Sequence, residues 1–368
     1  MTRRIRILLT AFSITLAALR GQPAAALPLF AHEYGLSCQK CHSAIPALNQ
    51  FGRAFLATGY RLEKVQPGPA FPVSLKINLA YTSEPDPGLP RAAVDEIEFL
   101  TGGRIGSRVN YFLEHYAVDG GVPGTTREAW VNYWIGADAA RIPMSVRAGQ
   151  FTLPLPVDPE SFRETANHYA VFDQTVGRNP FRFFEPKAGV SVHAGRFDRG
   201  LSLDVSALRG HDVQSGLPAA GTDLMTALHQ TLGRFEVTAY RYAGRRDIAP
   251  GTADGSDRFT RTGFGLRYER GRWTSENVIQ MNADTNADGA GTAVRSSGGF
   301  TQLRYAFTPK LFGLVRYDGT SDAEGLFRST TALVGYRVAR NARLTIEDVV
   351  THVPAAHHRL NAQLTAGY

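Results

Sequence analysis

Cysteine is scarce in this chain. Only two cysteines occur among the 368 residues, and both lie in the stretch Cys38-Gln-Lys-Cys41. A framework of structural disulfides is therefore excluded, because no second pair of thiols is present. Apolar runs of the length needed for a membrane-spanning helix are also missing. No block of Lys or Arg residues occurs either, so we expect no nucleic-acid partner.

The first 26 residues have the pattern of a secretory signal peptide. Three arginines fall within the first six residues, an apolar core covers 7–19, and three alanines end at Ala26. We expect cleavage after Ala26. The alternative is an uncleaved membrane anchor, but the apolar run is short for that role. The segment 1–26 holds four arginines and no acid, so the net charge of +7 falls to about +3 in the mature chain.

From about residue 71 onward, segments of roughly ten residues alternate apolar and polar side chains. In 73–82 (VSLKINLAYT), for example, every second residue is apolar. A period of two indicates β-strands. Alternation over this length is typical of transmembrane barrels, in which polar side chains face the lumen. The last segment fits this pattern, because its inward set is polar: Asn361, Gln363, Thr365 and Gly367.

We count about sixteen such segments. They lie near 72–82, 94–104, 107–117, 127–136, 144–151, 187–195, 199–208, 222–232, 234–244, 258–268, 272–282, 297–306, 310–318, 328–337, 341–350 and 358–368. Breaks between them are alternately short and long, as expected for periplasmic turns and outer loops. The sequence thus predicts an all-β fold, an antiparallel transmembrane barrel over 71–368 in the lipid of a bacterial outer membrane. The alternative is a soluble β-sandwich or two stacked barrels.

The longest connection, 152–186, is rich in proline and aromatic residues. A loop of this length is commonly functional or disordered, and its aromatic content argues for order. We expect it to fold over or into the lumen. The alternative is an outer cap that binds nothing.

The motif Cys38-x-x-Cys41-His42 has the form of a c-type haem attachment site. Cys38 and Cys41 would bond the haem vinyl groups, and His42 would be the proximal iron ligand. The alternatives are a zinc site, which would need further ligands nearby, and a thioredoxin-like site, which would need a βαβ setting. We therefore expect one covalent haem c in a cytochrome segment over 27–70. This segment is too short to enclose a haem alone, so the barrel interior is its nearest cover.

The surrounding stretch, 29–62, resembles the haem segment of the fused outer-membrane cytochrome–porin family, which includes outer-membrane cytochromes of iron-oxidising bacteria. The resemblance covers about thirty residues and rests on Phe30-Ala31, Tyr34-Gly35, Cys38, Cys41-His42, Pro46, Leu48-Asn49, Phe51-Gly52, Phe55 and Gly59-Tyr60. It implies electron transfer across the outer membrane, with the haem segment plugging the barrel. It does not identify the electron donor.

The sixth iron ligand is not evident from the sequence. No methionine lies between the signal peptide and residue 143. Strand parity places His193 and His229 in the lumen near the periplasmic end, and His32 is close to the motif in sequence. His193 is the first candidate for the distal ligand, although a lumen histidine is more often a polar wall residue. An open or water-bound site is the alternative.

These patterns lead to one functional hypothesis and two alternatives. The hypothesis is an electron conduit in which one haem c passes electrons between an extracellular donor and a periplasmic carrier such as a soluble cytochrome. Ferrous iron is a candidate donor, which would make the protein an extracellular Fe(II) oxidase; another metal or reductant is equally compatible. The first alternative is a porin-like transport channel with a haem-bearing plug or redox sensor. The second is a periplasmic haem-binding β-protein.

Overall fold

The computed structural model describes residues 29–44, 46–62, 73–85, 87–135, 142–197, 199–209, 221–248, 255–322 and 325–367. The predicted signal peptide, 1–26, and the predicted boundary between the haem segment and the barrel, near 70, lie outside these residues. Within the described part, no helix is long and apolar enough to cross a membrane.

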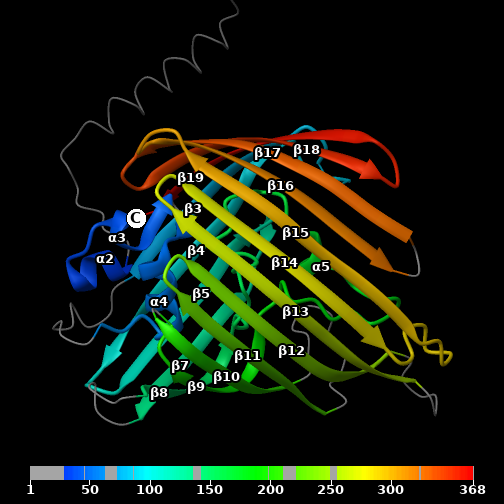
Figure 1. Cartoon of the computed structure of the whole chain (residues 1–368). Helices are drawn as coiled ribbons and strands as arrows, with labels where there is room; N and C mark the ends of the chain where they lie inside the picture. The colour runs from blue at the N-terminus through cyan, green and yellow to red at the C-terminus, as the bar shows by residue number, and fades with distance from the viewer. Residues whose placement is uncertain are drawn as a thin grey trace, which may run out of the picture.

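Most of the chain forms one closed antiparallel barrel (Figure 1). Its strands are β3 (Val73–Thr82), β4 (Ala92–Ile105), β5 (Val109–Asp119), β6 (Val122–Pro123), β7 (Thr126–Ile135), β8 (Met144–Phe151), β9 (Lys187–Gly195), β10 (Gly200–Arg209), β11 (Thr222–Leu232), β12 (Phe235–Asp247), β13 (Ser256–Arg270), β14 (Trp273–Asp284), β15 (Val294–Ala306), β16 (Leu311–Asp322), β17 (Gly325–Ala339), β18 (Ala342–Val353) and β19 (His357–Gly367). β6 has only two residues, which leaves sixteen long strands. All sixteen predicted strands are confirmed.

The barrel closes where its first and last strands meet. β19 pairs with β3, with Gly367 opposite Lys76 and Asn361 opposite Thr82. Both ends of the barrel segment therefore lie at the same end of the molecule, as an even number of strands requires. We call this the plug end, because the N-terminal helices lie there too (Figure 1).

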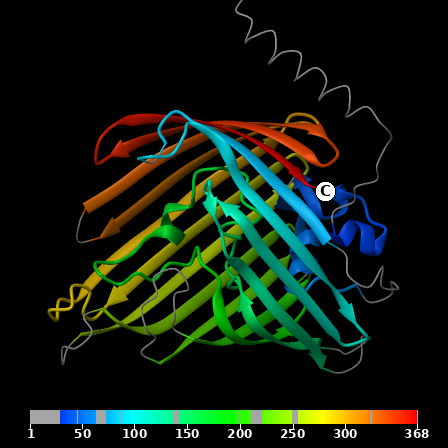
Figure 2. The same cartoon turned by 180° about the vertical axis from the view of Figure 1, so that it is seen from behind.

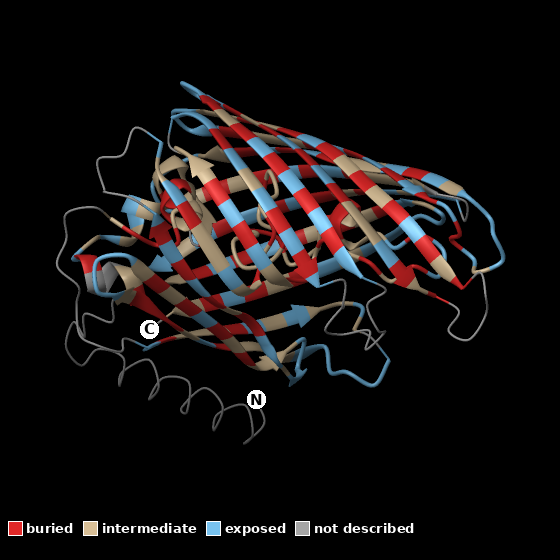
Figure 3. Ribbon diagram, turned by 90° about the horizontal axis from the view of Figure 1, so that it is seen from below, coloured by how far each residue is buried: buried red, intermediate tan, exposed pale blue. Residues whose placement is uncertain are grey.

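Burial alternates along the strands as a lipid-exposed barrel demands, and Figure 3 shows this as stripes. On β11, Leu224 and Leu228 are 56% and 44% exposed, whereas Met225 and His229 are buried. Exposed aromatic residues gather near the plug end of the outer surface, where the Phe235 ring lies 4.7 Å from Tyr268 and the Trp273 ring 4.4 Å from Tyr305. Such aromatic girdles mark the membrane interface of outer-membrane barrels.

The interior is filled by two further parts of the chain. The first is the plug, residues 29–62, with helices α2 (Leu29–Tyr34), α3 (Cys38–Cys41) and α4 (Gln50–Ala57) and the short strands β1 (His42–Ala44) and β2 (Ala47–Leu48). The second is the lumen loop, residues 152–186, which contains α5 (Ala170–Asp173). Seen from behind in Figure 2, this loop runs inside the barrel. Buried apolar residues of plug, loop and wall form one continuous cluster.

Candidate functional site

The plug is held in the barrel mouth by stacked aromatic rings. The Phe30 ring stacks on Tyr60 with centroids 4.1 Å apart, and Tyr60 stacks on Trp130 of the wall at 6.1 Å. Tyr60 has a φ of 61°, a left-handed conformation that costs a non-glycine residue on the order of 1 kcal/mol. Each aromatic pair contributes about 0.5–1.5 kcal/mol beyond its buried area, so the stacking offsets this strain.

The cysteine motif forms a single helical turn with its own supports. Cys38 and Cys41 are half-buried free thiols at the two ends of α3. Asn49 Nδ2 donates hydrogen bonds to the carbonyls of Gln39 and Lys40, at 3.3 and 3.1 Å, and Asn49 Oδ1 caps α4 at Gly52 N. Gly52 is needed because a Cβ there would lie 2.2 Å from the Cys41 carbonyl oxygen. Asn49 and Gly52 thus join α4 to the motif, which gives a physical reason for their place in the pattern described above.

His42 follows the turn and has one ring nitrogen engaged. Its Nδ1 lies 2.7 Å from the Pro46 carbonyl oxygen. A carbonyl only accepts, so Nδ1 carries the proton and Nε2 has its lone pair free for a metal. Burial lowers the pKa of His42, although its backbone hydrogen bonds oppose this. The imidazole is therefore neutral, the form that ligates iron.

Cys38, Cys41 and His42 line a single cavity, which we call the motif cavity. Its empty space, including the part open to solvent, is about 1260 Å³. The walls come from the plug, from strands β3, β4, β5, β7 and β19, from Asn341 in the turn after β17, and from Ser161 and Phe162 of the lumen loop. Apolar side chains dominate the lining: Leu29, Phe30, Leu36, Leu48, Phe55, Leu75, Leu100 and Phe112.

The motif cavity also has a charged side. Lys76 Nζ lies 2.6 Å from Glu98 Oε1 and 3.3 Å from Glu96 Oε2. Glu114 accepts a hydrogen bond from Ser161 Oγ at 3.1 Å. Glu98 and Glu114 are 1% and 2% exposed. These groups were not identified from the sequence as site residues, because alternation reveals only that a side chain faces the lumen and not which cavity it reaches.

The residues around the motif fit a c-type haem. Two thiols and a histidine whose Nδ1 is held by the Pro46 carbonyl line the same mainly apolar cavity. Burial, followed by the neighbouring Cys38, raises the pKa of the Cys41 thiol to about 11, so this sulfur carries its proton at neutral pH. No group of three or more His, Cys, Asp or Glu residues able to hold a metal ion occurs in the described part of the chain.

His193 faces the lumen, as strand parity predicted, but it does not line the motif cavity. It lines a second cavity of about 1320 Å³, which we call the loop cavity. Its Nδ1 lies 3.0 Å from Asp204 Oδ1 and its Nε2 lies 3.3 Å from the Gly195 carbonyl oxygen. His229 lines neither cavity, and its ring stacks on Phe197 at 3.8 Å. The side chain of His32 lies outside the described residues.

No described histidine other than His42, and no described methionine, lines the motif cavity. The distal role of His193 therefore stays a prediction, and its two ring contacts do not favour it.

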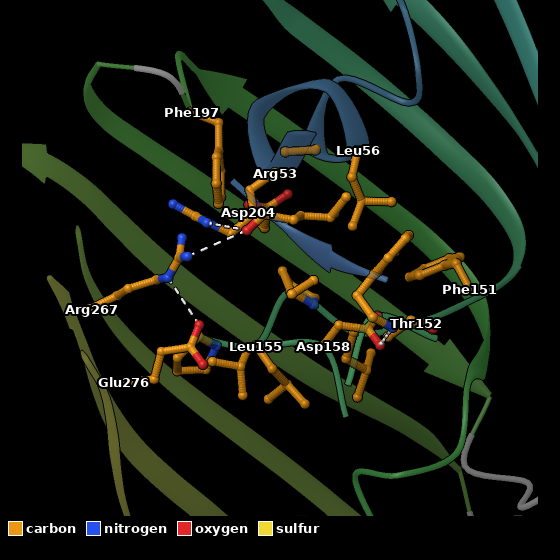
Figure 4. A pocket seen from close by; sticks show the side chains of 18 of the residues that line it. Arg53, Leu56, Phe151, Thr152, Leu155, Asp158, Phe197, Asp204, Arg267 and Glu276 are labelled. Atoms are coloured by element: carbon orange, nitrogen blue, oxygen red, sulfur yellow. Dashed lines mark hydrogen bonds and ion pairs between the residues drawn. The ribbon is translucent and has the colours of Figure 1, made fainter. Parts of the chain in front are cut away.

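The lumen loop crosses the barrel to the opposite wall. Ala166 N and Asn167 N donate to the Glu347 carboxylate at 2.9 and 2.8 Å. Arg316 donates to the carbonyls of Asn167 and His168 at 3.0 and 2.7 Å. The loop therefore folds into the lumen, one of the two positions expected from the sequence. Between the loop and the plug lies the loop cavity, whose lining includes Arg53, Asp204 and Arg267 (Figure 4). Arg53 and Arg267 both donate to the Leu48 carbonyl oxygen, at 2.7 and 3.3 Å.

Comparisons with known proteins support the barrel fold. No protein-family model and no curated protein matches the chain. Many solved structures share its fold, and three of them illustrate the similarity. The channel DcaP of Acinetobacter baumannii is 12% identical, covers 81% of this chain and 97% of its own, and has a TM-score of 0.58. The anion-selective porin from Comamonas acidovorans is 10% identical, with 81% and 99% covered and a TM-score of 0.60.

The third is OmpF of Salmonella typhi in complex with daunomycin, with 14% identity, 81% and 97% coverage and a TM-score of 0.59. Identities this low establish a shared fold alone. The chain is a porin-like, sixteen-stranded antiparallel β-barrel of the bacterial outer-membrane type, which confirms the fold predicted from the sequence.

Proposed function

We propose that this protein is an outer-membrane electron conduit, a porin-like barrel whose plug carries one covalent haem c. The observation that supports this best is the placement of Cys38, Cys41 and His42 on one largely apolar cavity between plug, wall and lumen loop. When bound, haem c supplies one-electron redox chemistry. The electrons would pass between an extracellular donor, with ferrous iron as one candidate, and a periplasmic carrier such as a soluble cytochrome.

The chain's own residues have distinct parts in this proposal. The Cys38 and Cys41 thiols would hold the haem by adding across its two vinyl groups, an addition in which each S–H hydrogen ends on a vinyl carbon and no oxidant is needed. His42 Nε2 would be the iron ligand, while the Pro46 carbonyl fixes the tautomer and ring orientation of the imidazole. Phe30, Phe55 and the other apolar wall residues would exclude water, which together with axial ligation would set the redox potential.

The lumen loop completes the path in this proposal. Ser161 and Phe162 bring the loop to the motif cavity, and the same loop bonds the far wall through Ala166 and Asn167. A cofactor in the motif cavity is thereby covered on the side away from the plug end. The barrel's apolar band is about 25 Å tall, so a redox group within the lumen is nearer to the extracellular surface than one bound at the periplasmic surface would be.

The second candidate function is a porin-like transport channel with a haem-bearing plug or redox sensor. Two observations favour it: the matched structures are channels and porins, and the loop cavity leaves space in the lumen beside the plug. The two candidates differ in what crosses the membrane, which is electrons in the first and solutes in the second.

The test begins with protein purified from outer membranes. Haem staining after denaturing electrophoresis should be positive, negative for Cys38→Ala/Cys41→Ala, and unchanged for the neighbouring control Ser43→Ala. The protein is then placed in liposomes that contain an oxidised acceptor, with an impermeant reductant such as ferrous iron outside. Internal reduction that requires both cysteines supports the conduit. Normal reduction of the haem by dithionite, no internal reduction and steady ion conductance in planar bilayers would instead support the channel.

A further inference from the structure

The turns at the plug end share one chemical feature. Seven connections join long strands there, and the structure describes six of them in large part; the seventh, between β7 and β8, is mostly outside the described residues. Each of the six carries an exposed Arg or Lys. We call this set the basic rim: Arg108, Arg199, Arg234, Arg272, Lys310 and Arg340.

The positive charge of the basic rim is not neutralised by the described residues around it. None of the six side chains has a described carboxylate within 4.0 Å. Glu269, near the end of β13 on this side, is a third exposed and lies 3.2 Å from Arg267, a lumen residue. The described residues of the six turns include no Asp or Glu, and the acids that the sequence places in the seven connections, Asp138 and Asp198, lie outside the described residues.

The positive surface continues from the rim to the plug. Lys40 stands between the two cysteines of the motif and is exposed, with Nζ 4.5 Å from the Phe51 ring centroid. Lys40 belongs to the plug in the barrel mouth, away from the perimeter where lipid headgroups lie. Lys40 therefore adds one exposed positive charge within the mouth to those at its edge.

The opposite end of the barrel lacks this bias. Its described connections contain exposed residues of both signs, such as Glu84, Arg91 and Asp288. The basic rim is thus a property of one end, the end at which Cys38 and Cys41 lie.

We infer that the basic rim and Lys40 form the docking surface for a soluble electron carrier with an acidic face. This inference rests on the proposed function, which requires a periplasmic redox partner at the plug end. Several like charges around one mouth raise the local concentration of an oppositely charged protein and accelerate its encounter. Lipid phosphates are the other anions near such a rim, but they reach its perimeter and not Lys40.

The experiment uses the purified holoprotein in phosphatidylcholine nanodiscs and two soluble probes. One probe is a small basic cytochrome c, and the other is the same cytochrome with succinylated lysines, which makes it acidic. Binding is measured by fluorescence anisotropy at about 10 mM salt, where the Debye length is about 30 Å, and at about 1 M salt, where it is about 3 Å. The rim variant is Arg234→Glu/Arg272→Glu/Lys310→Glu. The matched control reverses three exposed arginines at the other end, Arg91→Glu/Arg258→Glu/Arg295→Glu.

The wild type and the control should bind the acidic probe at low salt and the basic probe far more weakly. The rim variant should bind the acidic probe about tenfold or more weakly, and the difference should disappear at high salt. Reoxidation of the pre-reduced protein by the acidic probe should slow by the same factor. Equal binding of the two probes by the wild type, or equal losses in the rim and control variants, would overturn the inference.

A lipid role has a different signature. Thermal stabilisation by phosphatidylglycerol that is lost in the rim variant, with unchanged binding of the acidic probe, would overturn the inference in favour of a lipid contact. Failure of the proposed function is separate from both results, because it appears as wild-type protein without covalent haem.

Discussion

Arg53 ties the plug to the barrel wall, and its replacement should loosen the plug measurably. Its Nε donates to Glu236 Oε2 at 2.9 Å, a second bond joins the same two side chains, and Nη1 donates to the Leu48 carbonyl at 2.7 Å. The two side chains are only 12% and 9% exposed. In Arg53→Met the Glu236 charge would lose its main partner. Removing one member of a buried pair costs about 3–5 kcal/mol, or about 2–3 kcal/mol after allowance for partial exposure.

A loss of 2–3 kcal/mol corresponds to a shift of about 30- to 160-fold toward the undocked plug. We expect more frequent openings in planar bilayers and faster proteolysis of the plug in Arg53→Met than in the wild type. The double variant Arg53→Met/Glu236→Met should restore most of the plug docking that Arg53→Met loses, because no buried carboxylate is left without a partner. Arg241→Met, on the exposed face of the strand that carries Glu236, is the control. If Arg53→Met stays as closed as this control, the pair does not hold the plug and the reasoning is refuted.

Three further predictions concern the plug and the loop. Gly52→Val places a Cβ 2.2 Å from the Cys41 carbonyl oxygen, so haem staining should be lost while the heat-modifiable migration of the barrel persists. Gly35→Ala brings the strain of an alanine at φ 63° but no contact within 4 Å beyond its chain neighbours, so it should keep the stain. His193→Ala should leave the haem absorption spectrum unchanged, because His193 lines the loop cavity; a shifted Soret band would show that it is a ligand. Burial raises the pKa of Glu160 in the lumen loop to about 7 from 4.5, so loop docking should be strongest below pH 4.5 and weaken as the pH rises through 7. Proteolysis of the loop should follow this profile and depend less on pH in Glu160→Gln, in which Glu164 and His168 of the loop still titrate with shifted pKa values.

The barrel was predictable because each strand has one face in lipid and one in the lumen. This environment imposes a period of two on the sequence, and a shift by one residue would exchange the faces. The segment predicted at 222–232 is β11 with the same bounds, and Met225 lies inside as its parity requires. The strand ends were less accurate. β17 begins at Gly325 rather than near 328, because its first residues extend beyond the region where alternation is regular.

The candidate site was predictable only where it is local in sequence. Cys38, Cys41 and His42 are neighbours, so their motif is visible without a structure. The contact of Ser161 with Glu114 joins residues 47 positions apart, and nothing in either segment indicates it. The same limit applies to His193. Strand parity correctly predicted that the His193 side chain faces the lumen. Which cavity it lines depends on the position of its strand around the barrel, and this position is set only when the ring of strands closes.

The seam between β3 and β19 sets an order for biogenesis. β3 is the first strand of the barrel and its partner β19 is the last strand that the structure describes, so the ring closes only after every strand between them has been delivered. Until β19 pairs with β3, the wall around the plug has a gap at this seam. Afterwards the half-buried Cys38 and Cys41 face inward, between wall and loop. In the proposed function, an enzyme that attached haem to these thiols would therefore have better access before β19 is in place, and the timing of ring closure would act as a checkpoint on maturation.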